Sequence, residues 1–479
     1  MAKRGPERNE DPILRFLRVK PQPTENERGK GDRRKSDLAD TGTPRGGRTT
    51  LDEAKRKGLI GWLQVLGPGL ITGASDDDPS GIGTYSQVGS QFGYGLLWTA
   101  FFTFPMMAAV QELCSRIALQ TGVGLAVALR RKFPAWLVGF AILGLLGANL
   151  FNIGADLGAI AAGGSLLSGG IIPALWLVIP VALLILGMEI WATYATIFKI
   201  FKWLTLVLFA YVITAFFAHP QLLAVLGATF VPHIELSKDF IMALVAVVGT
   251  TISPYLFFWQ AASEVDEMVA AGATAPLIGR RRRLKIAELR AARFDIAVGM
   301  AFSNLVMYFI ILTSAAVLHA HGRTNIQTAA QAASALAPLA GPLAFVVFSI
   351  GLIGTGLLAV PILAGSATYA LRGFLGLSGT LASKPQHRPT FYLMLTVATL
   401  AGVVMNFTHL DPIRALFITA VINGMVAPPL LVLIVLLGAD KRMMKARASG
   451  RLSLGLTGIT TIFMAVAAIL LIGTLIVRA

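Results

Sequence analysis

Three consecutive carboxylates, Asp76, Asp77 and Asp78, interrupt a long apolar stretch, and Pro79 follows them directly. A charged side chain at bilayer depth costs at least roughly 2.5 to 3.5 kcal/mol, so these residues must serve something other than folding. They are expected to end a half-helix, where the negative end of the helix dipole favours a cation. The pattern predicts a cation site in which Asp78, beside the proline, is the strongest candidate ligand. The alternative is that some of the three face a water-filled vestibule and bind nothing.

A second apolar stretch is interrupted in a matching way at Ser253 and Pro254. Thr250, Ser253 and Tyr255 place hydroxyl groups there, and the proline frees backbone carbonyls from their usual helical donors. These oxygen ligands suit a hard cation such as Mg²⁺ or Mn²⁺, and no Cys, Met or His is in reach to favour a softer metal. The alternative is that the hydroxyls bond back to their own helix, as Ser and Thr do in membrane helices.

A third set of polar residues falls on one helical face. Asn149, Asn152 and Asp156 follow an i, i+3, i+7 spacing within an apolar segment, so their side chains point the same way. Such a stripe must face the bundle interior or a water-filled cavity. Interhelical hydrogen bonding and an ion path both fit this pattern.

Other acidic residues are predicted to have structural roles. Glu112 and Arg116 are spaced i, i+4, which favours a local ion pair. Glu264, together with Asp266 and Glu267, closes a predicted span. We expect a solvated helix end there rather than an exit path for ions.

The composition assigns the chain to the polytopic membrane proteins. Of its 479 residues, 55% are hydrophobic and only 14% are charged, with a mean hydropathy of +0.69. This is more apolar sequence than soluble cores can bury. The single cysteine, Cys114, excludes an intramolecular disulfide and is expected to be a small core residue.

Eleven apolar segments of roughly 20 residues each predict eleven membrane-spanning helices. They cover residues 60–91, 94–118, 137–167, 172–190, 195–218, 238–268, 294–318, 341–370, 390–407, 413–437 and 453–476. The interruptions fall in spans 1 and 6, so spans 1 to 5 and 6 to 10 form two halves that enter the membrane from opposite sides. This is the inverted-repeat plan of many secondary transporters, whose broken helices meet at the bilayer midplane. We expect a transporter core over residues 59–437, followed in residues 438–479 by a basic cytoplasmic loop and the eleventh span.

Residues 1–58 are polar, with 16 Lys and Arg against 10 Asp and Glu. This composition predicts a disordered basic tail without the apolar segment of a signal peptide, and its charge is compatible with contact to anionic lipid. If the tail lies in the cytoplasm, few of the 41 Lys and Arg residues lie on the external side of the membrane, namely Lys238, Arg323, Arg414 and Arg478. The positive-inside rule then places the N-terminus in the cytoplasm and the C-terminus outside, with the plasma membrane, here a bacterial inner membrane, as the location.

The chain resembles the NRAMP family of divalent-metal transporters over spans 1 to 10. The resemblance rests on Gly67-Pro68-Gly69 with Asp78-Pro79 in the first span, on Gln111 to Arg116 with Thr121-Gly122 in the second, and on Ala155-Asp156-Leu157 in the third. It implies a LeuT-like fold of two inverted five-span halves with discontinuous spans 1 and 6.

Departures from the family pattern are also informative. Where the family has Asp-Pro-Gly-Asn, this chain has Asp-Pro-Ser-Gly, so Gly81 replaces an asparagine ligand. The sixth-span Met-Pro-His becomes Ser253-Pro254-Tyr255, and the acidic residue expected three positions after Asp156 is Ala159. These exchanges remove a thioether that helps to select transition metals, and the His and acidic residue associated with proton movement. The pattern is most similar to the NRAMP-related magnesium transporters, a branch that carries Mg²⁺ and Mn²⁺.

The resemblance implies import of Mg²⁺ and Mn²⁺ as partly hydrated ions without proton coupling. The implied metal site comprises Asp77, Asp78, Gly81, Thr250, Ser253 and Tyr255. Asp78 is then the anionic anchor, and the Thr250 carbonyl, Ser253 and Tyr255 complete the shell. Because Mg²⁺ gives up its waters reluctantly, small residues such as Gly81 leave room for a hydrated ion.

Three other functions are considered. A proton-coupled Mn²⁺ or Fe²⁺ importer is disfavoured by Tyr255 and Ala159. An organic-solute transporter of the same architecture would carry small residues in place of the three carboxylates. An intramembrane enzyme that holds Mg²⁺-diphosphate would need a second acidic cluster and facing basic groups. We therefore expect no catalytic residue, no bound cofactor and no nucleic-acid partner; the partners are divalent metal ions and the lipid bilayer.

Overall fold

The computed structural model is helical throughout the part of the chain that it describes. That part comprises residues 65–191, 206–270, 286–377, 389–408, 411–444 and 450–477. The predicted tail, residues 1–58, lies outside it, as does the first part of the predicted fifth span. The all-α fold expected from the sequence is confirmed.

Two spans consist of two half-helices each. Span 1 comprises α4 (Pro68–Asp76) and α5 (Pro79–Phe92), and span 6 comprises α13 (Lys238–Thr251) and α14 (Pro254–Ala270). Each second half begins with a proline, which cannot continue the preceding helix but fits the first turn of a new one. The breaks therefore lie where the sequence predicted them.

Longer helices form the other described spans, with bounds close to the predicted ones. They are α6 (Trp98–Thr121), α8 (Ala135–Leu167), α9 (Ala174–Trp191), α15 (Ile286–Val317), α18 (Ala344–Leu375), α19 (Pro389–Met405), α20 (Pro412–Gly438) and α22 (Arg451–Val477). The largest difference is in α15, which begins at Ile286 rather than at residue 294. By length and hydropathy, seven described helical segments can cross a membrane, or eight if α5 and α6 are joined across a 107° bend.

Short helices lie between the spans or at their ends. They are η2 (Gly93–Leu96), α7 (Leu125–Lys132), η3 (Leu206–Leu208), α11 (Phe209–Phe217), α12 (Leu222–Phe230), η4 (His319–His321), α16 (Ala329–Ala333), η5 (Ser334–Leu336), α17 (Ala337–Ala340), η6 (Gly341–Leu343), η8 (Asn406–Thr408) and α21 (Lys441–Met444). Two of them, η3 and α11, form the described part of the predicted fifth span.

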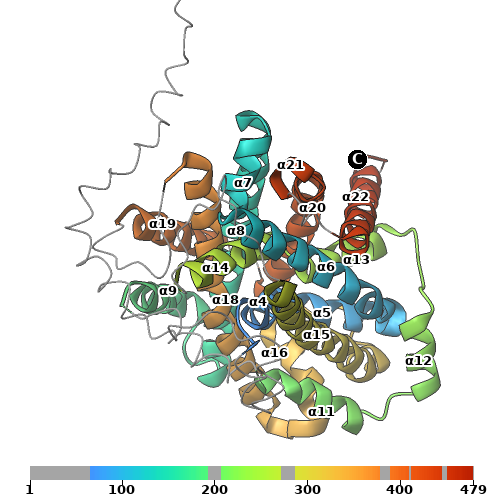
Figure 1. Ribbon diagram of the computed structural model, residues 1–479. Helices are drawn as coiled ribbons and strands as arrows, with labels where there is room; N and C mark the ends of the chain where they lie inside the picture. Colours follow the sequence, from blue (N-terminus) through green and yellow to red (C-terminus); the bar gives the residue numbers. More distant parts are fainter. Residues whose placement is uncertain are drawn as a thin grey trace, which may run out of the picture.

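The half-helices of span 1 lie in the middle of the molecule, surrounded by α14, α15 and α18 (Figure 1). The eleventh span, α22, packs on the outside against α6, α13 and α20. Unbroken helices thus separate the breaks from lipid. This arrangement is required because lipid cannot hydrogen bond to the backbone groups that a break sets free.

Glycines bring the backbones of the half-helices close to their neighbours. A Cβ at Gly73 in α4 would lie 2.1 Å from the carbonyl oxygen of Gly299 in α15. A Cβ at Gly249 in α13 would lie 2.1 Å from the carbonyl oxygen of Ala420 in α20. Close backbone packing of this kind is typical of membrane helices. The first half of each broken span is therefore pressed against one unbroken helix.

Candidate cation site

Asp78 is held at the start of α5, where its carboxylate caps the helix. Oδ1 accepts hydrogen bonds from the Gly81 amide at 2.8 Å and the Ser80 hydroxyl at 2.6 Å, while Oδ2 lies 3.3 Å from the Tyr255 hydroxyl. The positive end of the α5 dipole and these donors stabilise the ionised carboxylate. Asp76 is the last residue of α4. The expectation that all three carboxylates end the first half-helix is therefore wrong for Asp78.

The second break supplies hydroxyls and a carbonyl. The Tyr255 hydroxyl donates to the Ser75 carbonyl at 2.9 Å and faces Asp78, so it links the two breaks. The Ser253 hydroxyl donates to the Thr250 carbonyl at 2.7 Å, as expected if it bonds back to its own helix. A hydroxyl oxygen that donates its hydrogen retains its lone pairs, so this arrangement leaves Ser253 able to ligate a cation.

Side chains from the two breaks meet in one buried space. The hydroxyls of Ser80 and Thr250 lie 3.3 Å apart. Gly81 faces the same space, because a Cβ there would lie 3.6 Å from Thr250 Oγ1. All of these residues, with Asp78 and Tyr255, are buried. The fold thus brings together predicted site residues that are some 170 positions apart in the chain.

Two buried carboxylates in this region have no hydrogen-bond partner. Both oxygens of Asp77 and both of Asp156 are unpaired, although only 1% of Asp77 and 0% of Asp156 is exposed. A buried, unpaired carboxylate is strongly unfavourable unless a proton or a cation joins it. Among the described residues, no three His, Cys, Asp or Glu side chains converge as a metal cage.

The polar stripe of α8 divides into two parts. Asn149 donates to the Leu363 carbonyl of α18 at 3.2 Å, which is the interhelical hydrogen bonding considered from the sequence. Asn152 and Asp156 are buried without hydrogen-bond partners, and α8 packs against α5, which begins at the first break. The second part of the stripe therefore extends the polar region of the candidate site into α8.

The start of α4 is capped from another helix, a feature that the sequence analysis missed. Asp295 of α15 is fully buried and accepts hydrogen bonds at 2.8 to 3.0 Å from three backbone amides, those of Gly67, Gly69 and Leu70. These amides are donors that a helix start leaves free. The only signal in the sequence was a carboxylate within an apolar span, which by itself indicates function rather than capping.

Three further buried residues were not singled out from the sequence. Ser303 of α15 donates to Asp76 Oδ2 at 2.7 Å, and the Thr251 hydroxyl lies 3.5 Å from the sulfur of Met307. Asn423 of α20 is 0% exposed with both amide atoms unpaired, and an amide in an apolar span was the available signal. Met307 corrects the expectation that no sulfur is in reach, because the fold places a thioether beside the second break.

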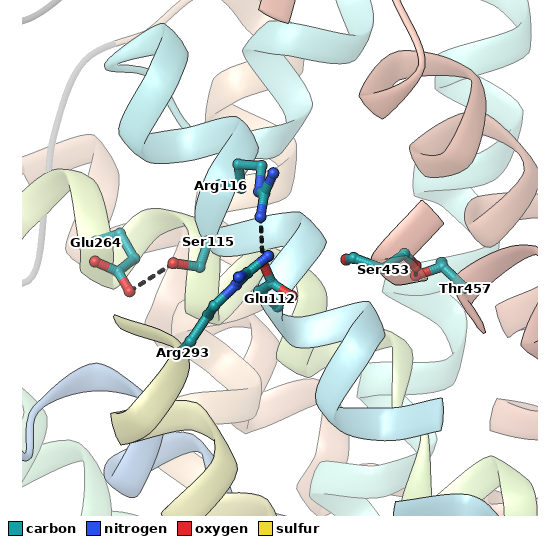
Figure 2. Close-up of polar contacts among 7 residues, drawn as sticks. All are labelled: Glu112, Ser115, Arg116, Glu264, Arg293, Ser453 and Thr457. Carbon is teal, nitrogen blue, oxygen red and sulfur yellow. Dashed lines mark hydrogen bonds and ion pairs between the residues drawn. The ribbon is translucent and has the colours of Figure 1, made fainter. Parts of the chain in front are cut away.

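A chain of polar contacts runs from α4 through α14 to α6. Thr72 Oγ1 of α4 lies 2.5 Å from the side-chain oxygen of Gln260 in α14, whose amide nitrogen donates to Glu264 at 3.1 Å. The chain continues to α6, where Ser115 donates to Glu264 at 2.8 Å (Figure 2). Only 1% of Glu264 is exposed. The prediction of a solvated helix end at Glu264 is therefore wrong.

Glu112 adds a second connection. It pairs with Arg116 in its own helix, as predicted, and also with Arg293 of α15 at 2.5 Å (Figure 2). Polar contacts thus link α4 to α14, α14 to α6, and α6 to α15.

Broken helices that meet at buried oxygen ligands define a membrane transporter built on an inverted repeat. The sequence model of the family described as natural resistance-associated macrophage protein-like matches residues 69–474, and the chain belongs to this family, NRAMP. Two relatives are each named divalent metal cation transporter MntH. The protein from Deinococcus radiodurans is 26% identical over 85% of this chain and 89% of its own length, and that from Pectobacterium carotovorum is 26% identical over 75% and 82%.

Solved structures share the fold. A manganese transporter from Eremococcus coleocola superimposes with a TM-score of 0.67 at 16% identity, covering 86% of this chain and 87% of that one. Mhp1, a nucleobase-cation-symport-1 family transporter, gives a TM-score of 0.51 at 15% identity over 91% and 95% of the two chains. The LeuT-like architecture expected from the sequence is confirmed. The chain is a multi-pass membrane transporter and not an enzyme.

We expect Asp295→Asn to destabilise the protein by about 2 kcal/mol or more, because hydrogen bonds to a charged group contribute about 1.5 to 3 kcal/mol each. Unfolding of the purified protein in detergent measures this effect. Asp239→Asn is the matched control, since this exposed carboxylate lies in the first turn of α13 and contributes about 1 kcal/mol at most. Equal stability of the two variants would contradict the capping role of Asp295.

Proposed function

We propose that the chain transports divalent metal cations and that Mg²⁺ and Mn²⁺ are its substrates. The observation that carries this proposal is the Asp78 carboxylate, held between two broken spans among hydroxyl and carbonyl oxygens. Relatives named as divalent metal cation transporters and a structural neighbour named as a manganese transporter support the class of substrate. The exchanges at Gly81, Ser253 and Tyr255 support a place among the NRAMP-related magnesium transporters.

The donor set favours a hard, partly hydrated ion. The proposed ligand positions are Asp77, Asp78, Gly81, Thr250, Ser253 and Tyr255, which offer only oxygen atoms. Oxygen ligands suit Mg²⁺ and Mn²⁺, and Mg²⁺ usually keeps several of its waters. A Cβ at Gly81 would lie 3.2 Å from the Tyr85 ring and 3.6 Å from the Thr250 hydroxyl, so the absence of a side chain there keeps these groups uncrowded beside the proposed site. The sulfur of Met307 faces the hydroxyl of Thr251, so this thioether is engaged beside the site rather than offered to the ion.

Transport in this proposal proceeds without proton coupling. Tyr255 and Ala159 stand where the family pattern has a histidine and an acid, and both are fully buried. The membrane potential contributes about 2.3 kcal/mol per charge per 100 mV, hence about 4.6 kcal/mol for a divalent ion. This drives a gradient of about a thousandfold, so uptake needs no proton.

The proposal includes a topology for the whole chain. Residues 1–58 form a cytoplasmic tail that contacts anionic lipid, residues 59–437 form the transporter core, and residues 438–479 form a basic loop and the eleventh span. The distribution of Lys and Arg supports a cytoplasmic N-terminus and an external C-terminus in a bacterial inner membrane.

A proton-coupled Mn²⁺ or Fe²⁺ importer is the second candidate. The observation in its favour is Asp156, a buried carboxylate without a hydrogen-bond partner on α8, which packs against α5. Protonation of Asp156 would then depend on whether a cation occupies the site at Asp78.

We expect Asp78→Asn to reduce Mg²⁺ and Mn²⁺ uptake into proteoliposomes to the background of empty vesicles, while the protein remains monodisperse. Asparagine caps a helix about as well as aspartate, so the substitution removes the charge and keeps the start of α5. Asp239→Asn, an exposed carboxylate remote from the breaks, is the control and should retain uptake. Wild-type flux in Asp78→Asn would exclude Asp78 as the anchor.

We expect Ser253→Met combined with Gly81→Asn to shift selectivity away from Mg²⁺. The asparagine fills the space beside Thr250, and the thioether supplies a soft ligand. Competition of Mn²⁺ and Cd²⁺ against Mg²⁺ in the same flux assay measures the change, with each single variant as an internal comparison. An unchanged or Mg²⁺-shifted ratio would place these positions outside the site.

We expect metal uptake to follow the imposed membrane potential and to leave the internal pH unchanged. The assay is liposome uptake with an enclosed pH dye and a potassium diffusion potential. Metal-dependent acidification of the lumen that disappears in Asp156→Asn would contradict the uncoupled mechanism and support the proton-coupled one.

A further inference from the structure

An apolar groove of about 450 Å³ lies between the beginning of α8 and the end of α18, remote from the cation site. Its lining comprises Ala135, Trp136, Gly139, Phe140, Ile142, Leu143, Leu146, Leu371 and Phe374. Trp136, Phe140 and Leu143 are 72%, 71% and 68% exposed, and their i, i+4, i+7 spacing places them on one face of α8. The groove is therefore open along an apolar face of a membrane-spanning helix.

The floor of the groove is defined by a glycine. The ring of Phe374 rests on Gly139, where a Cβ would lie 3.1 Å from the ring. The absence of a side chain at Gly139 thus lets α18 approach α8 while the larger residues on either side form the walls. The result is an apolar groove with aromatic walls.

Two consecutive arginines in the last turn of α7, just before α8, have no carboxylate partner among the described residues. Arg130 places its guanidinium 5.1 Å from the centre of the Phe374 ring, a distance at which a cation is attracted to an aromatic face. Arg131 is the next residue and is exposed. Lys132, by contrast, pairs with Asp440 at 3.0 Å. In the described part of the chain no acidic group lies within ion-pair distance of Arg130 or Arg131.

One end of the groove holds the positive end of a helix dipole. The 33-residue helix α8 begins at Ala135 after Pro134, with no side chain capping its first amides. Free amides and the dipole favour an anion at such a helix start. The position of α7 is fixed by its contact with α18, since a Cβ at Gly373 would lie 2.9 Å from Ala126. The two arginines, the helix start and the apolar groove are therefore held in one arrangement.

We propose that this groove binds an anionic phospholipid, with an acyl chain along Trp136, Phe140 and Leu143 and the headgroup phosphate at Arg130, Arg131 and the start of α8. The groove joins apolar walls to arginines that have no acidic partner among the described residues. It therefore fits an amphipathic molecule with an anionic headgroup. Basic pockets between membrane helices are a recurrent setting for anionic headgroups. A zwitterionic lipid offers the same chains but places a positive group beside the arginines.

Trp136 lines the groove, so its fluorescence reports whether a lipid chain occupies the groove. The full chain is reconstituted in phosphatidylcholine vesicles that contain acyl-brominated phosphatidylglycerol or acyl-brominated phosphatidylcholine at equal mole fraction, and the Trp136 signal is the difference between wild type and Trp136→Phe. Bromine quenches only a tryptophan that it contacts. We expect phosphatidylglycerol to occupy the groove about thirtyfold over phosphatidylcholine, because each of the two arginines near the surface contributes about fivefold, or about 1 kcal/mol.

Two charge variants test the assignment. In Arg130→Gln/Arg131→Gln the preference should fall to about one. Lys441→Gln/Arg442→Gln removes the same charge from exposed residues next to Asp440, the partner of Lys132, and should keep the preference. Thermal unfolding checks that both variants are folded.

Several results would overturn the proposal. The first is equal quenching by the two lipids, and the second is a preference for phosphatidylglycerol that survives in Arg130→Gln/Arg131→Gln. The third is an equal loss of this preference in Lys441→Gln/Arg442→Gln, which would indicate a general charge effect. Quenching by neither lipid would indicate that a second copy of the chain covers the groove. Displacement of the lipid by inorganic phosphate alone would indicate a simple anion site.

Discussion

The interior of a membrane offers no hydrogen-bond partner to a broken helix, and the arrangement of this protein follows from that constraint. Side chains meet several backbone groups that the helix ends leave free. Asp295 accepts from amides at the start of α4, Asp78 accepts from an amide at the start of α5, and Tyr255 donates to the Ser75 carbonyl in the last turn of α4 at 2.9 Å. The helices that supply these groups cannot move away from the breaks without exposing them. The partners that make the breaks tolerable therefore also fix the geometry of the candidate site.

Much of the fold could be predicted because its signals are local. Proline at residues 79 and 254 marks both breaks, and hydropathy marks the spans to within a few residues in most cases. The convergence of Asp78 with Thr250 and Tyr255 follows from placing each break at the middle of its span. Where bounds differ, as in α15, the helix continues beyond its apolar part into charged turns that hydropathy does not detect.

The remainder of the site depends on contacts between distant segments, which a single sequence does not encode in its spacing. Asp295 caps amides some 226 residues earlier, and Met307 reaches the second break from the middle of α15. Glu264 has the composition of a solvated helix end, yet Ser115 and Gln260 surround it. Residue type alone predicts a cation ligand at Asp78, which stays a prediction, and it misjudged Glu264, because burial is set by the neighbouring helices and not by the residue itself.

The attachment of α4 to α15 has a mechanical consequence. Asp295 holds the start of α4 and Ser303 holds its end, so these two helices form one rigid body. Rotation of the first span is then concentrated in the backbone torsion angles of Asp77 and Asp78, which separate α4 from α5. The same torsions aim the Asp78 carboxylate at Tyr255. In the proposed transport function, a change in these torsion angles would turn the Asp78 carboxylate away from Tyr255 and would therefore alter the affinity for the ion.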